Sequence, residues 1–191
     1  MTITVYCASS RKVDKKYFDD ARLLADELYK QNARIIYGGG AVGLMGALAD
    51  RYLELGGDIT GVIPEFMVKV EWAHPGVKDM RIVHDMHERK KLLIEESDAI
   101  LALPGGTGTL EELTEVITLK RLGKFNKPII LLNTSGFYNP LQNFFKKMAD
   151  EHFLHPEHLM MWQLLDKPEN FWQVYKKAPE WPENAINKAQ I

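Results

Sequence analysis

The stretch Pro104-Gly105-Gly106-Thr107-Gly108-Thr109-Leu110-Glu111-Glu112 decides the fold of this chain. It separates a continuous apolar run, residues 99–103, from an amphipathic pattern over residues 110–122. Glycines permit a tight turn and a close approach of the backbone, and the first turn of a helix presents unpaired N–H groups at the positive end of its dipole. The stretch therefore predicts a buried strand, a turn and a helix whose N-terminus can bind a phosphate.

Two known nucleotide motifs and one structural explanation can be compared with this stretch. No Lys-Ser or Lys-Thr follows the last glycine, so it is not a Walker loop, and the G-x-G-x-x-G dinucleotide pattern is absent. Thr109 and Glu112 have the spacing of a capping box, which any helix can use. A capping box does not explain three glycines in four positions, so we interpret the turn as a ligand site. A phosphate bound there is expected to raise the pKa of Glu112 by like-charge proximity.

Strands and helices alternate outward from this stretch in both directions. The expected strands cover residues 3–8, 34–37, 59–63, 81–83, 99–103 and 128–132, and the expected helices cover 17–30, 44–55, 86–96, 110–122, 141–149 and 169–177. This alternation predicts an α/β fold with a doubly wound, mostly parallel sheet and helices on both faces. Ligands bind such sheets beyond the carboxyl ends of the strands.

A second glycine-rich segment, residues 38–46, also follows an expected strand and precedes a helix. Gly39, Gly40 and Gly43 could let the backbone approach another part of the ligand. The alternative is a plain tight turn in which Gly46 permits contact between helix and sheet. Ser9, at the end of the first strand, is a further candidate for ligand contact.

Two other segments have more than one interpretation. Residues 65–78 have weak periodicity and are expected to form a long functional loop outside the core. The helix over 86–96 begins with three consecutive cations, which favours a solvated face with Asp85 and Arg89 paired at i, i+4. The same cations could instead neutralise a substrate phosphate or orient a carboxylate.

Composition limits the classes of protein to which the chain can belong. Its 191 residues, 46% hydrophobic and 26% charged, predict one domain over residues 1–178, followed by a polar C-terminal extension, 179–191, that docks loosely. A net charge of −2 with both signs mixed argues against nucleic acid and anionic membranes as partners. Cys7, the single cysteine, is expected to be a buried small hydrophobe, and we expect a cytoplasmic protein with no leader and no membrane span. His152, His155 and His158 are interrupted by Pro156, so no metal site is expected.

The two glycine segments, with Met86 to Lys90 between them, resemble the LONELY GUY (LOG) family of cytokinin riboside 5′-monophosphate phosphoribohydrolases. The family pattern P-G-G-x-G-T-x-x-E is matched from Pro104 to Glu112, and the arginine of its upstream M-H-x-R-K element is matched by Arg89. The similarity runs from Val5 to about Leu132. It implies a Rossmann-like fold, a homodimer with active sites near the interface, and no cofactor.

The resemblance also implies roles for individual residues. Arg89 and Glu112 would be the catalytic pair. Substrate contacts would come from a larger set that combines the family's positions with the glycine segments: Glu71, Lys90, Gly105, Gly106, Thr107, Gly108, Thr109, Leu110, Glu111, Thr118, Gly39, Gly40, Gly43 and Ser9.

The expected reaction is hydrolysis of the N-glycosidic bond of a nucleoside 5′-monophosphate, with cytokinin-type or adenine bases, to the free base and ribose 5-phosphate. The alternative is a Rossmann-like module that binds a nucleotide or cofactor without turnover, because fold alone does not separate binding from catalysis. The family also carries a lysine decarboxylase label. That label implies pyridoxal phosphate chemistry, for which no segment of the sequence argues.

Overall fold

A computed structural model describes residues 1–182 and 185 of the chain, and within them seven strands form one fully parallel sheet. The spatial order is β4-β3-β2-β1-β5-β6-β7. The strands are β1 (Thr2–Tyr6), β2 (Arg34–Tyr37), β3 (Ile59–Pro64), β4 (Asp79–Val83), β5 (Ala99–Ala102), β6 (Ile129–Leu132) and β7 (Gln163–Leu165). The chain moves outward from β1 in one direction and later returns to the other side of it, so a topological switch point lies between β1 and β5.

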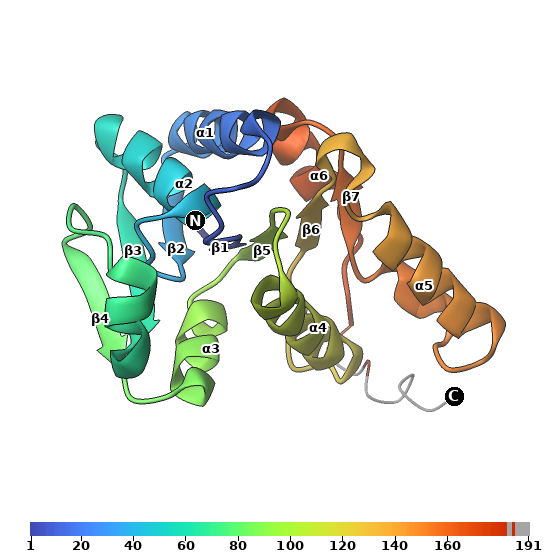
Figure 1. Cartoon of the computed structure of the whole chain (residues 1–191). Coiled ribbons are helices and arrows are strands. Elements are labelled where there is room, and N and C mark those ends of the chain that lie inside the picture. Colours follow the sequence, from blue (N-terminus) through green and yellow to red (C-terminus); the bar gives the residue numbers. More distant parts are fainter. Residues whose placement is uncertain (183–184, 186–191) are drawn as a thin grey trace.

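Helices cover both faces of this sheet (Figure 1). They are α1 (Lys15–Tyr29), α2 (Gly43–Glu54), α3 (Met86–Glu95), α4 (Thr107–Arg121), α5 (Asn139–Asp150) and α6 (Phe171–Lys177). One core cluster joins the sheet to α1, α2 and α6, and a second joins it to α3, α4 and α5. The predicted doubly wound α/β fold is confirmed.

The central strands show why the sheet is buried on both faces. Every residue of β5 and β6 is buried, which matches their continuous apolar sequences, Ala-Ile-Leu-Ala and Ile-Ile-Leu-Leu. Successive side chains of β5 enter alternate clusters: Ala99 and Leu101 pack toward one face, Ile100 and Ala102 toward the other. The turn after β5 therefore follows a strand that is buried on both faces of the sheet.

The structure departs from the sequence expectations at β7 and in residues 65–78, as well as in the C-terminal segment. Strand β7 was not predicted, because its three residues are too few for a periodic pattern. Residues 65–78 form a 3-10 turn, Glu65–Met67, and a π-helix, Val68–Trp72, and part of the segment belongs to the interior. Val77 packs into the first core cluster and His74 is buried, so the expectation that this whole segment lies outside the core was wrong.

The C-terminal segment is described only at residues 179–182 and 185. Trp181 and Ala185 are buried in the second core cluster, and the Trp181 indole N–H donates to the Lys120 carbonyl at 2.8 Å. Loose docking is therefore wrong for these two residues, while the rest of the predicted extension lies outside the described residues. None of the described helices has the length and apolar character needed to cross a membrane.

Candidate active site

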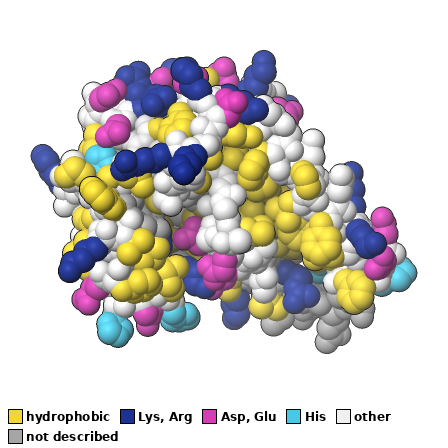
Figure 2. All heavy atoms as spheres, in the orientation of Figure 1, with side chains coloured by type: hydrophobic (Ala, Val, Ile, Leu, Met, Phe, Trp, Pro, Cys, Tyr) yellow, Lys and Arg dark blue, Asp and Glu magenta, His cyan; other side chains and the backbone are white. Residues whose placement is uncertain are grey.

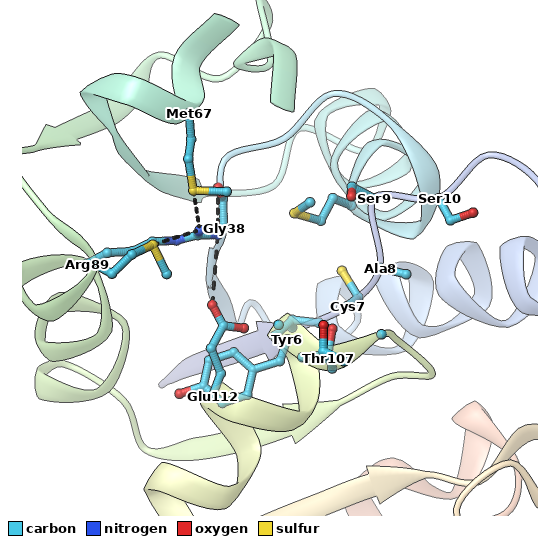
Figure 3. A pocket seen from close by; sticks show the side chains of 16 residues that line it. Tyr6, Cys7, Ala8, Ser9, Ser10, Gly38, Met67, Arg89, Thr107 and Glu112 are labelled. Carbon is cyan, nitrogen blue, oxygen red and sulfur yellow. Dashed lines mark hydrogen bonds and ion pairs between the residues drawn. The ribbon is translucent and has the colours of Figure 1, made fainter. Parts of the chain in front are cut away.

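A cavity of about 370 Å³ lies beyond the carboxyl ends of β1, β2 and β5, at the switch point of the sheet (Figure 3). The end of β1 with its loop, the loop after β2, the 3-10 turn Glu65–Met67 and helices α2, α3 and α4 contribute to it. Its lining residues are Val5, Tyr6, Cys7, Ala8, Ser9, Ser10, Gly38, Met45, Met67, Met86, Arg89, Gly106, Thr107, Gly108, Thr109 and Glu112. Its size is within the usual range for small-molecule sites.

The glycine turn after β5 forms one wall of the cavity. Gly106 is the N-cap of α4 and Thr107 is its first residue, so the unpaired N–H groups of the first helical turn lie at the cavity. A Cβ atom built on Gly106 or Gly108 would have no neighbour within 4 Å, whereas one on Gly105 would lie 2.1 Å from the Thr109 hydroxyl oxygen. Gly105 therefore makes the turn compact, and Gly106 and Gly108 leave open space in front of the helix N-terminus.

The structure excludes the capping-box interpretation of Thr109 and Glu112. Helix α4 starts three residues earlier than that interpretation requires, and no side chain caps it. A reciprocal cap exists on α3 instead: the Asp85 carboxylate accepts from the Glu88 N–H at 2.8 Å, and the Glu88 carboxylate accepts from the His84 N–H at 2.9 Å. Because Glu112 does not cap α4, its carboxylate is left for the cavity.

Arg89 is directed into the cavity from α3 and not toward solvent. Its side chain is 5% exposed, and its guanidinium donates to the Gly38 carbonyl at 3.3 Å and to the Met67 sulfur at 3.4 Å (Figure 3). The expected i, i+4 pair with Asp85 on a solvated face was wrong, because Asp85 caps the helix. The backbone hydrogen bond from Glu88 holds the pKa of Asp85 below its usual value, as expected for a cap.

Glu112 faces Arg89 across the cavity. Its carboxylate lies 3.8 Å from the Arg89 guanidinium, and its side chain is 11% exposed. Tyr6, at the end of β1, lies beside this pair, and burial together with the charge of Glu112 raises the pKa of the Tyr6 hydroxyl well above its usual value. The Arg89 guanidinium and the Glu112 carboxylate therefore lie in a part of the cavity wall that is largely shielded from water, next to the neutral Tyr6 hydroxyl.

The glycine segment at residues 38–46 has a different role from the glycine turn at residues 105–108. Gly40 pairs with Ala73 in an isolated antiparallel bridge, and the Gly39 carbonyl accepts from the His74 N–H at 2.9 Å. Gly43 packs against the backbone of Ser9, and Gly46 approaches the Ala41 carbonyl and not the sheet. Gly39, Gly40 and Gly43 line no part of the cavity in the described residues, so their contact with substrate remains a prediction.

Several residues that the sequence places in the site lie just outside this cavity. Lys90, Glu111 and Thr118 line a shallow hollow between α3 and α4, where the Lys90 ammonium lies 2.5 Å from the Glu111 carboxylate. The hydrogen bond that the ammonium donates to that carboxylate raises the pKa of Lys90. Leu110 is 40% exposed. The side chain of Glu71 is outside the described residues, and the substrate contacts of all five residues remain predictions.

Part of the cavity wall was not predicted from the sequence. Gly38, Met45, Met67 and Met86 line it without having been assigned a role. Gly38 and Met86 belong to the two motifs at residues 38–46 and 86–90, so both could have been predicted to line the site. Nothing in the sequence links Met67 to Arg89. Cys7 is buried as expected, and it also lines the cavity.

The fold and the cavity define a Rossmann-like α/β protein with a ligand site at its switch point and a buried Arg–Glu pair in that site. Matches with known proteins identify its family. The family model described as "Possible lysine decarboxylase" matches residues 45–174. The cytokinin riboside 5′-monophosphate phosphoribohydrolase of Rhodococcoides fascians is 43% identical over 81% of this chain and 79% of its own length.

Plant relatives extend this match. The Arabidopsis thaliana cytokinin riboside 5′-monophosphate phosphoribohydrolase LOG3 is 44% identical over 81% of this chain and 72% of its own length. The chain belongs to the LOG family, and the predicted resemblance is confirmed.

Solved structures share the fold at much lower identity. The molybdenum cofactor binding protein of Rippkaea orientalis has a TM-score of 0.70 and 20% identity, over 92% of this chain and 94% of that one. The molybdenum cofactor carrier protein of Chlamydomonas reinhardtii has a TM-score of 0.69 and 17% identity, over 93% of this chain and 97% of that one. These two likenesses concern the fold alone.

Proposed function

We propose that this protein hydrolyses the N-glycosidic bond of nucleoside 5′-monophosphates, with cytokinin-type or adenine bases, and releases the free base and ribose 5-phosphate. The observation that carries the proposal is the joint placement of Arg89, Glu112 and the open glycine turn in one cavity. The relatives named above as phosphoribohydrolases support the same reaction.

The glycine turn is proposed to hold the 5′-phosphate. The N–H groups and the dipole of α4 attract an anion at Gly106 to Thr109, and the open space at Gly106 and Gly108 lets phosphate oxygens approach the backbone. Fixing the phosphate at the turn positions the ribose toward Glu112, one helical turn further along α4. This anchoring supplies the proximity contribution to catalysis.

Glu112 is proposed to act on the anomeric carbon. Cleavage of an N-glycosidic bond passes through an oxocarbenium-like state, in which a nearby carboxylate stabilises the positive charge or activates the attacking water. Arg89, held 3.8 Å away, orients Glu112 or a ribose hydroxyl. The low exposure of both side chains strengthens these interactions relative to water.

Decarboxylation through pyridoxal phosphate suits this cavity poorly. That chemistry needs a lysine for the Schiff base. Among the described residues, no lysine lines the cavity, and Lys90 in the neighbouring hollow is paired with Glu111 and Glu115. The word decarboxylase in the family description therefore finds no support in the geometry.

The protein is further proposed to be a cytoplasmic homodimer. The hollow between α3 and α4 places Lys90 and Thr118 close to the cavity but on an outer surface, where a second copy could enclose them. Charges of both signs are mixed over the face shown in Figure 2, with hydrophobic side chains between them, which suits a protein partner better than a polyanion.

The proposed reaction is tested by incubating the purified protein with AMP, isopentenyladenosine 5′-monophosphate and the two unphosphorylated nucleosides, and following free base and ribose 5-phosphate by chromatography. Release from the monophosphates and at least about 100-fold slower release from the nucleosides is expected, because the phosphate anchors the substrate. Equal turnover of both forms would refute the anchoring role. Binding of AMP without release of base would favour the alternative, a nucleotide-binding module without turnover.

A further inference from the structure

The guanidinium of Arg89 is held by two methionine sulfurs as well as by a backbone carbonyl. Its Nη1 atom lies 3.4 Å from the Met67 sulfur and 3.9 Å from the Met86 sulfur, while Nη2 donates to Gly38 (Figure 3). Met86 is on the first turn of α3, one turn before Arg89, whereas Met67 comes from the distant segment 65–78. We call this segment the strap.

The strap is fastened to the domain at the end away from Met67. Ala73 bridges to Gly40, the Trp72 carbonyl accepts from the Ala41 N–H at 3.0 Å, and His74 Nε2 lies 3.0 Å from the Asp50 carboxylate on α2. Since the His74 Nδ1 atom accepts from the Gly76 N–H, Nε2 carries the proton and donates to Asp50. These contacts fix the position from which Met67 reaches the guanidinium.

A thioether is suited to orienting an arginine that must also act on a substrate. Sulfur is a weak, uncharged acceptor, so these two contacts direct the guanidinium without neutralising its charge. A carboxylate at the same place would form a strong ion pair and compete with Glu112 and the substrate. The long, adaptable Met side chain also fills the space beside the planar group.

We propose that Met67 is a positioning residue for the N-glycosidic hydrolysis: through its thioether, the strap holds the Arg89 guanidinium toward Glu112 and the reacting ribose. Met86 supports the same group from α3 at a longer distance. The inference rests on the proposed function, because it assigns Met67 a role in that reaction.

The kinetic test compares matched methionine variants with AMP as substrate. Met67→Leu keeps the apolar bulk and removes the acceptor, so kcat is expected to fall about tenfold with KM changed less than about twofold. Met67→Gln, which has a similar length and an amide oxygen, should recover most of kcat. Met148→Leu is the control, because Met148 is half-buried on α5, packs against the second core cluster and does not line the cavity.

A second measurement does not depend on turnover. Arginine side-chain ¹⁵N NMR of the wild type, with the signal assigned by Arg89→Lys, reports how fast the guanidinium rotates about its Cζ–Nη bonds. Rotation should be faster in Met67→Leu than in the wild type and unchanged in Met148→Leu. If the wild type released no base from AMP, the proposed function would fail, and this measurement would still decide whether Met67 holds Arg89.

Three results would overturn the positioning role. They are a kcat for Met67→Leu equal to that of the wild type, an equal fall in Met148→Leu, and no recovery in Met67→Gln together with unchanged guanidinium rotation in Met67→Leu.

Discussion

The two glycine-rich turns of this protein have similar sequences and opposite surroundings. Both follow a buried parallel strand and begin a helix, at residues 38–46 and 105–108. In the first turn, an added Cβ at Gly43 would lie 2.4 Å from the Ser9 carbonyl carbon; in the second, a Cβ at Gly106 would have nothing within 4 Å. In the first turn, the absence of side chains lets neighbouring protein segments pack closely. In the second turn, it leaves room for a ligand.

This difference separates two meanings of a glycine that a sequence cannot separate. A glycine surrounded by protein atoms supports the fold, and a glycine surrounded by open space at a helix N-terminus is free to meet a substrate. Substitutions by alanine should therefore affect stability at the first turn and catalysis at the second.

Gly43→Ala should give the largest effect. Gly43 has a φ of 65°, and the new Cβ would meet the Ser9 backbone, which cannot move as a flexible side chain can. Left-handed strain and this clash together predict a loss of about 3 kcal/mol in the free energy of unfolding. Urea denaturation measures the free energy of unfolding. A loss below about 0.5 kcal/mol would show that the close packing at Gly43 does not stabilise the fold.

Gly106→Ala should lower catalysis strongly and stability only slightly. Its φ of −90° suits alanine, so the free energy of unfolding should fall by less than about 1 kcal/mol, the usual cost of an alanine N-cap. The added methyl group would occupy the proposed phosphate position, and kcat/KM for AMP should fall about 100-fold. Steady-state kinetics measure kcat/KM, and urea denaturation measures the free energy of unfolding. An unchanged kcat/KM would show that the substrate phosphate does not bind at this turn.

Gly38→Ala tests the one point where the first turn reaches the catalytic pair. Its Cβ would lie 2.4 Å from Nη2 of Arg89, so the guanidinium must leave the position in which it lies 3.8 Å from Glu112. We expect kcat to fall about tenfold, because a displacement of about 1 Å in a catalytic group is costly. If kcat stays at the wild-type value while Gly43→Ala destabilises the fold, a shift of the Arg89 guanidinium does not affect catalysis. The first turn then contributes to stability alone.

Lys120→Met should leave catalysis unchanged, because Lys120 lies near the far end of the helix that begins with the second turn. Burial lowers the pKa of Lys120 to about 8, and its ammonium donates to the Lys127 carbonyl at 2.6 Å. Between pH 8 and about 10.4 the unfolded chain binds the proton more tightly, so unfolding free energy rises with pH in this window.

The Lys120→Met variant should lose this rise, which amounts to about 2.5 kcal/mol between pH 7.5 and 10. Urea denaturation of both proteins at the two pH values measures it. An equal pH dependence in the variant and the wild type would contradict the low pKa of Lys120.

The sequence predicted the sheet well because buried parallel strands such as β5 and β6 are continuous apolar runs. It missed β7, whose three residues carry no period, and it left Thr109 and Glu112 open to a capping explanation because a cap depends on where a helix starts. Met67 reaches Arg89 from more than twenty residues away in the sequence, through a strap held by backbone bonds. Contacts of this kind depend on tertiary structure, and the strap carries no motif that reveals them.

The most direct test of the central claim, that this cavity is a hydrolytic site and not only a nucleotide-binding site, is to measure AMP binding and adenine release side by side for the wild type and Glu112→Gln. The amide keeps the size of the side chain and removes the charge. The account predicts a Kd for AMP within about threefold of the wild type and at least a 100-fold lower rate of release in the variant. A variant that releases adenine at the wild-type rate, or a wild type that binds AMP and releases none, would contradict it.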